Sequence, residues 1–259
     1  KGKLSMRNII LGMSAFALAA VATPALAEEA APAVTVSGSA TVVSDYRFRG
    51  ISQTDKRFAV QGGFTVSHES GLYASVWGSS IDEYVAGASD QEIDLIAGYT
   101  KTVGAATFDV GVLYYYYPGA EAIVPGYNSD FFEPYASVKG TFGPVTAKVS
   151  AAYAPKQHAI AGLHTKDDNL YGALDLSGSV GDTGVSLSAH LGHNFMDDSF
   201  LSAGKDYTDW SLGASYTWNH LTFGVSYVDT NFSKGALTSP FTGRDIAKAG
   251  VVGSIGVSF

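Results

Sequence analysis

The chain contains no cysteine, so it has neither a disulfide framework nor thiolate chemistry. It has only eight prolines, and after residue 21 it has no apolar run approaching the length of about 20 residues that a membrane-spanning helix needs. It also lacks a run of Lys and Arg, which argues against a nucleic-acid partner. Gly, with 30 residues, and Tyr, with 15, are abundant, and this composition argues against helices and favours an all-β protein.

Familiar catalytic motifs are missing as well. The chain has no G-x-S-x-G, no phosphate-binding loop and no H-E-x-x-H. Ser188 and His190 are two residues apart, but a Ser–His pair of a lipid-modifying enzyme should lie on the outer wall of a barrel, and these two fall on the predicted inner face. We therefore predict no enzyme, no catalytic residue and no cofactor.

Acidic pairs occur in several predicted loops, where carboxylates suit Ca²⁺ or Mg²⁺ if several converge. None has the spacing of a known calcium motif, so we predict no metal ligand. These loops could instead share divalent ions with lipopolysaccharide, or simply be solvated, which is the default for charged loops. The pairs are Asp82-Glu83, Asp167-Asp168 and Asp197-Asp198.

The first 27 residues have the pattern of a secretory signal peptide. Lys1, Lys3 and Arg7 precede the apolar run 9–21, and Ala25-Leu26-Ala27 supplies small residues for cleavage. The alternative, a membrane anchor, needs a longer run. Met6 is a candidate initiator, which would make residues 1–5 upstream sequence. We expect cleavage after Ala27, which removes three of 16 Lys+Arg and no Asp or Glu and lowers the formal net charge from −8 to −11.

Beyond a short N-terminal segment at residues 28–33, expected in the periplasm, apolar and polar residues alternate with period two. In residues 34–49, one parity carries Val34, Val36 and Val42 and ends in aromatics, and the other is rich in hydroxyls and ends in charge. Such alternation indicates strands with one apolar and one polar face. The predicted strands are 34–49, 58–68, 72–80, 91–100, 106–117, 131–140, 145–154, 169–179, 185–194, 207–218, 221–228 and 246–259.

The connections between these strands alternate in length. Short turns fall at 69–71, 101–105, 142–144, 181–183 and 219–220, and longer loops separate the other pairs. Strands near the bilayer-crossing length of about 9–11 residues, joined by alternately short and long connections, are typical of outer-membrane barrels. We therefore predict that residues 34–259 form an all-β transmembrane antiparallel up-and-down β-barrel of about 12 strands, with short periplasmic turns and long extracellular loops.

Two segments add a resemblance to known families. The last strand ends in Phe259 with Val257, Ile255 and Val251 on the same face, which resembles the C-terminal signal of bacterial outer-membrane proteins and implies the barrel-assembly machinery as a partner. SDYRFRGISQTD, at residues 44–55, resembles the early signature of the TorF family of porins from proteobacteria. This resemblance implies the outer membrane of a Gram-negative bacterium as the location, with its lipids and lipopolysaccharide as surroundings.

The charged residues of the polar parity are expected to face the lumen, while Tyr46 and Phe48 are expected in an aromatic girdle at the lipid interface. The acid excess of this set suggests a mild cation preference, and Arg47 and Arg49 form a basic arm that could bind an anionic group. The predicted lumen and constriction set is Asp45, Arg47, Arg49, Glu92, Asp94, Asp109, Glu133, Lys139, Lys148, Asp175, Asp209 and Lys248.

Two hypotheses about the function of this lumen remain open. The first is a porin-like channel for passive diffusion of small hydrophilic solutes or ions, which a barrel wider than eight strands has room for. The second is a non-conducting barrel in which opposite charges pair across the lumen, and in which acidic extracellular loops serve adhesion or the envelope's structure. The sequence does not separate them.

Overall fold

The computed structural model describes residues 33–120, 128–161, 165–196 and 198–259. The predicted signal peptide, residues 1–27, and nearly all of segment 28–33 lie outside this range. Within the described residues, twelve strands form the barrel: β1 (Val34–Val43), β4 (Ala59–His68), β5 (Leu72–Ser80), β6 (Gln91–Val103), β7 (Ala106–Tyr116), β8 (Phe131–Phe142), β9 (Val145–Gln157), β10 (Asp167–Ser179), β11 (Val185–Asn194), β12 (Tyr207–Trp218), β13 (Leu221–Thr230) and β14 (Gly250–Ser258).

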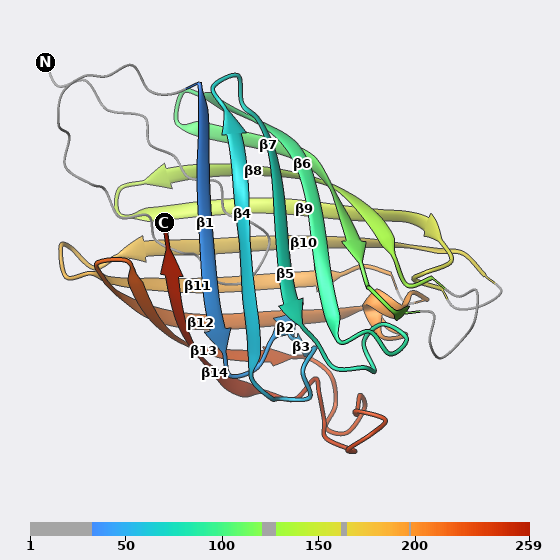
Figure 1. The fold of residues 1–259 in the computed structure, drawn as a ribbon. Coiled ribbons are helices and arrows are strands. Elements are labelled where there is room, and N and C mark those ends of the chain that lie inside the picture. Colours follow the sequence, from blue (N-terminus) through green and yellow to red (C-terminus); the bar gives the residue numbers. More distant parts are fainter. Residues whose placement is uncertain (1–32, 121–127, 162–164, 197) are drawn as a thin grey trace, which may run out of the picture.

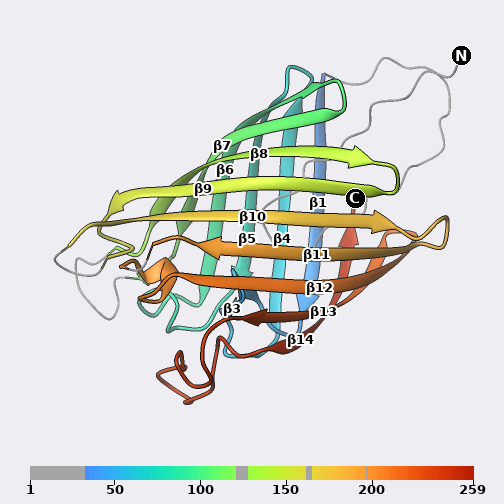
Figure 2. The same cartoon turned by 180° about the vertical axis from the view of Figure 1, so that it is seen from behind.

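The strands close into a barrel because β1 pairs with β4 on one side and with β14 on the other (Figures 1 and 2). Every neighbouring pair in the ring is antiparallel, which confirms the predicted up-and-down barrel of 12 strands. Val42 illustrates the closure, since it is paired with Val60 of β4 and with Ile255 of β14. In the described part of the chain, no helix is long and apolar enough to cross a membrane.

The two ends of the barrel differ. At one end, here called the turn end, the connections are as short as two residues, and Phe259 lies at this end (Figure 1). At the other, the loop end, the connections are residues 44–58, 81–90, 117–130, 158–166, 195–206 and 231–249. Many apolar side chains of the strands point outward, such as Val251 and Leu212, which are 68% and 62% exposed. An exposed apolar belt of this kind is costly in water and favourable in lipid.

The inner wall changes character along the barrel axis. Toward the turn end, the inward positions are small and hydroxylated, for example Ser37, Thr65, Thr102, Ser177 and Ser188. Toward the loop end, the inward side chains are larger and buried, and they pack on residues from the loops. Figures 1 and 2 show why: the hairpin of β2 (Arg47–Phe48) and β3 (Ile51–Ser52) lies between the opposite walls of the barrel.

This hairpin belongs to the first loop, residues 44–58, and its position corrects two predictions. Strand β1 ends at Val43 rather than at Arg49, so Tyr46 and Phe48 lie outside the strand although the sequence alternation continues to them. Tyr46 is buried inside the barrel and packs edge-on against Trp77, and Phe48 packs edge-on against Tyr115. The prediction of a lipid-facing girdle for Tyr46 and Phe48 was wrong. The chain folds into the barrel after Val43, so odd and even residues of this segment both lie inside it.

Strand β5 resolves an ambiguous face of the sequence. Leu72 faces outward, and Tyr73 faces inward with its ring over Gly98 of β6. Its hydroxyl donates to Asp109 Oδ1 at 2.9 Å and also contacts the Tyr135 hydroxyl. A Cβ atom on Gly98 would lie 2.5 Å from Tyr73 Cζ, so glycine is the side chain that leaves room for this ring.

Gly98→Ala should therefore displace Tyr73 and lower the stability of the barrel. The expected cost is about 1–3 kcal/mol, the usual range for overpacking. The midpoint of urea unfolding in detergent measures it, with Gly104→Ala as a control in the open turn between β6 and β7, where the cost should come from the backbone alone. Equal losses in the two variants would contradict the role assigned to Gly98.

Candidate functional site

The tip of the first loop inserts an arginine into the barrel. Arg49 and Gly50 have φ values of 47° and 81°, and Phe48 pairs with Ile51 across them. Two successive residues with positive φ are typical of the tight turns that join hairpin strands. A Cβ atom on Gly50 would meet Thr230 Cγ2 at 2.6 Å, so this turn fits against the wall only with glycine.

Arg49 is buried and ion-paired. Its Nη2 donates to both carboxylate oxygens of Glu133 at 2.7 Å, and Tyr115 donates to Glu133 Oε2 at 3.2 Å. Its guanidinium lies over the rings of Phe48 and Tyr171, at 4.7 and 4.2 Å from their centroids. Burial opposes the charge of Arg49, but the Glu133 carboxylate and the neighbouring tyrosines Tyr115 and Tyr171 together outweigh it and raise the pKa of Arg49. The arginine therefore stays charged and fastens the loop to β8.

Arg47 fastens the same loop to the last one. Its Nε donates to Asp45 Oδ2 at 2.6 Å, and Ser52 donates to Asp45 Oδ1 at 2.6 Å. Its Nη1 donates to the carbonyl oxygens of Gly50, Ile246 and Lys248 at 2.9 to 3.2 Å. These bonds join β2 to the segment just before β14, and they leave the charge of Arg47 matched by Asp45.

A third set of contacts holds the outer side of the first loop. Arg244 Nη1 donates to Asp55 Oδ2 at 3.0 Å, and Arg57 forms an ion pair with Asp82. The hydroxyl of Tyr84 donates to the Ser52 carbonyl at 2.6 Å. The first loop is thus tied to the second and the last loops.

Beneath the loop, two carboxylates of β6 are enclosed. Tyr46 donates to Glu92 Oε1 at 2.9 Å, and Tyr117 donates to Glu92 Oε2 at 3.4 Å. Burial and then the charge of Glu92 raise the pKa of Tyr46, so its hydroxyl keeps the proton that it donates. Asp94, two residues further along the same face, is buried, and its Oδ1 accepts no hydrogen bond from a described residue.

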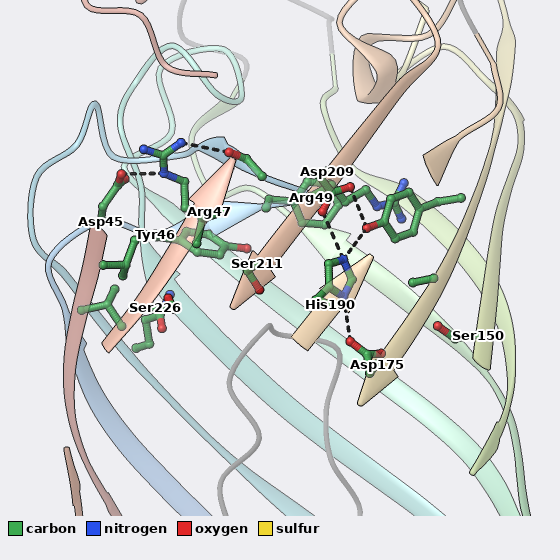
Figure 3. Close-up of a pocket in the computed structure, with 18 of the residues that line it drawn as sticks. Asp45, Tyr46, Arg47, Arg49, Ser150, Asp175, His190, Asp209, Ser211 and Ser226 are labelled. Carbon is green, nitrogen blue, oxygen red and sulfur yellow. Dashed lines mark hydrogen bonds and ion pairs between the residues drawn. The ribbon is translucent and has the colours of Figure 1, made fainter. Parts of the chain in front are cut away.

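On the opposite side, His190 sits between two carboxylates (Figure 3). Its Nδ1 lies 2.7 Å from Asp175 Oδ1, and its Nε2 lies 3.1 Å from Asp209 Oδ1. A ring that faces a carboxylate with each nitrogen donates to both only as an imidazolium. Tyr171 adds a hydrogen bond to Asp209 Oδ2 at 2.9 Å.

A cavity of about 120 Å³ lies between the first loop and this wall. At about 30 Å³ per molecule of liquid, it has room for a few waters. Its charged lining comes from two sources, the first loop and the inner positions of β9 to β12 (Figure 3). These charged residues are Asp45, Arg47, Arg49, Lys148, Asp175, His190 and Asp209.

Most of the predicted lumen residues face inward, but they form more than one group. Asp45, Arg47, Arg49, Lys148, Asp175 and Asp209 line the cavity. Glu92, Asp94 and Glu133 are buried on the inner face near the loop end, behind or against the first loop. Asp109 and Lys139 share the inner parity of β7 and β8 and lie nearer the turn end.

Lys248 is the exception. It was predicted in the last strand, facing the lumen, but β14 begins at Gly250 and Lys248 is exposed in the loop before it. Sequence reasoning also missed the roles of His190, Tyr171 and Tyr46. The Arg49-Gly50 dipeptide was the signal available for the hairpin, because such a pair flanked by apolar residues can form a tight turn. Among the residues that the structure describes, no group of three or more His, Asp or Glu is placed to hold a metal ion.

Residues 27–259 match a family described as a bacterial protein of unknown function (Gcw_chp). No curated protein sequence matches the chain. Among solved structures, an outer membrane channel from Pseudomonas putida F1 is similar over 89% of this chain and 96% of its own, with 12% identity and a TM-score of 0.51. A chain from a study of the in-meso crystallization of membrane proteins is similar over 86% of this chain and 83% of its own, with 11% identity and a TM-score of 0.53. At these identities the likeness concerns the fold.

Proposed function

The chain belongs to the Gcw_chp family of bacterial proteins of unknown function, and from its site we propose that it is an outer-membrane channel for passive diffusion of small hydrophilic solutes or ions. The observation that carries this proposal is the contrast between the two faces of the barrel. The outer face is apolar, and the inner face is lined by hydroxyls toward the turn end and by charged side chains around the cavity. A wall of this kind holds water inside and lipid outside.

The first loop limits the size of the solutes that can pass. It occupies the loop end with a buried hairpin and a buried ion pair, and it leaves a small cavity beside the wall. A barrel of 12 strands without such an insertion would enclose a wider lumen. We therefore place the constriction at Arg47, Arg49 and the carboxylates that face them, and we expect a narrow channel with low conductance.

The cellular setting is part of the same proposal. We propose that the signal peptide is cleaved after Ala27, that Phe259 and its strand are read by the barrel-assembly machinery, and that the turn end faces the periplasm. The loops then face outward, among lipopolysaccharide. The resemblance of residues 44–55 to TorF porins agrees with this setting, as does the fold shared with the outer membrane channel of Pseudomonas putida F1.

Planar-bilayer conductance of the refolded chain from Glu28 to Phe259 tests the proposal. Discrete, small current steps from folded protein are expected, and the folded state is checked by heat modifiability on a gel. A folded protein that never conducts would contradict the channel and return attention to the non-conducting barrel with acidic loops. In that case, exchanging the acidic loops should alter surface properties of the cell while solute uptake stays unchanged.

A further inference from the structure

Two lysines face each other on the inner wall of the barrel. Lys139 of β8 and Lys148 of β9 are register partners, and both are half-buried on the inward parity. Like charges on directly opposed positions of neighbouring strands repel each other. Neither ammonium group makes a hydrogen bond or an ion pair with a described residue. A repulsive pair that is not neutralised by contact is a position where a bound anion would be stabilising.

The carboxylate of Asp109 interacts electrostatically with both lysines. It lies on the next strand, β7, where it is paired with Ser137 rather than with Lys139, and its Oδ1 accepts a hydrogen bond from Tyr73. Asp175, the register partner of Lys148 on β10, is a second inner carboxylate, and its Oδ1 lies 2.7 Å from His190 Nδ1. Asp175 is therefore shared between Lys148 and His190, as Asp109 is shared between the two lysines. Asp109 and Asp175 reduce the repulsion between the lysines, but neither carboxylate forms an ion pair with them.

The carboxylates around the cavity, by contrast, already have partners. Asp45 is bound by Arg47 and Ser52, Asp209 by Tyr171 and His190, and Asp175 by His190. The two remaining inner carboxylates of β6, Glu92 and Asp94, do not line the cavity. With His190 as an imidazolium, four cationic side chains line the cavity against three carboxylates, and the charge of one of the four, Arg49, is matched by Glu133 behind the lining. The acid excess counted along the sequence therefore does not describe what a solute meets.

Hydroxyl groups surround the lysine pair. Thr107 is the register partner of Lys139, Thr146 precedes Lys148 by one inward step, and Ser150 follows it and lines the cavity. Each ammonium offers three donors and no acceptor, and hydroxyls can donate as well. Such a set is complementary to the oxygens of a small oxyanion, such as a phosphate or a carboxylate. The hydroxyl-lined half of the lumen gives such a solute a polar approach from the turn end.

We propose that Lys139 and Lys148 form a binding site for small oxyanions in the lumen, and that this site makes the channel prefer anions to cations. The preference rests on the proposed channel function, whereas binding at the site does not. Sequence counting favoured cations, so the two interpretations predict opposite signs for the same measurement.

Two measurements on the folded protein test the inference separately. Titration of inorganic phosphate into the protein in detergent, followed by calorimetry, should show binding, and Lys139→Gln with Lys148→Gln should weaken it by at least about tenfold, as expected for lost charge-assisted hydrogen bonds. In a KCl gradient, the parent's reversal potential should indicate chloride preference, and the double variant should lose it. Lys234→Gln, at an exposed position of the last loop, is the matched control and should change neither result.

The outcomes are distinguishable. Phosphate binding that is lost in the double variant, in a protein that never conducts, would retain the site and overturn the channel. Conductance with cation preference, or phosphate affinity equal in parent and double variant, would overturn the inference and leave the channel. Lys148→Arg keeps the charge and should retain both binding and selectivity. It shows whether a loss in the double variant comes from the missing charge or from misfolding.

Discussion

Glu133→Leu should release the first loop and increase the single-channel conductance severalfold. The substitution leaves Arg49 buried without its ion pair, and removing one partner of a buried pair costs about 3–5 kcal/mol. The guanidinium keeps only its stacking on Phe48 and Tyr171. Because an unpaired charge is more stable in water than in the buried site, the loop should move out of the lumen and expose Arg49 to solvent. Conductance recordings and hydrogen exchange of residues 46–56 would measure the two effects together.

The double variant Arg49→Met/Glu133→Leu is the control for this result. An apolar pair of similar size removes the charge and its partner at once, and such replacements are often neutral or stabilising. The double variant should therefore restore slow hydrogen exchange in the first loop and bring the conductance back toward that of the parent. If single and double variants conduct alike, the ion pair does not hold the loop in place.

Removal of the inserted hairpin should have the largest effect on the lumen itself. Replacing residues 46–56 with a short Gly-Ser linker deletes Arg47, Arg49 and the β2–β3 hairpin, while the twelve barrel strands keep their partners. The conductance should rise to that of an unobstructed 12-strand barrel, and larger solutes should enter. The barrel should lose stability at the same time, because the buried cluster at the loop end loses Tyr46 and Phe48.

Liposome swelling with sugars of increasing size would measure the gain in solute size. The matched control is replacement of residues 233–236. These four residues of the last loop are exposed and do not line the cavity. This control should leave conductance and solute size unchanged. A hairpin deletion that folds and still excludes the same solutes would mean that another segment forms the constriction.

The sequence by itself determined the barrel. Alternation of apolar and polar residues from Val34 onward sets two faces for each strand, and a one-residue error would exchange them. Since nearly every strand carries this pattern locally, the strand number, the antiparallel order, and the inward parity of residues such as Glu92, Asp175 and Asp209 could be predicted without coordinates. The two ends of the barrel could also be distinguished, because the alternately short and long connections can be read directly from the sequence.

Only the tertiary structure decided what the lumen contains. Tyr46 and Phe48 continue the alternation of β1 in the sequence, and they face inward because the chain turns after Val43. The partner of Arg49 lies 84 residues away on β8, and the partners of His190 lie on the two neighbouring strands, where the register decides which side chains meet. The effective charge of the lumen likewise depends on which carboxylates are paired and which lysines are not. Periodicity is a local property of each strand, whereas ion pairing across a lumen depends on distances that are set only when the barrel closes.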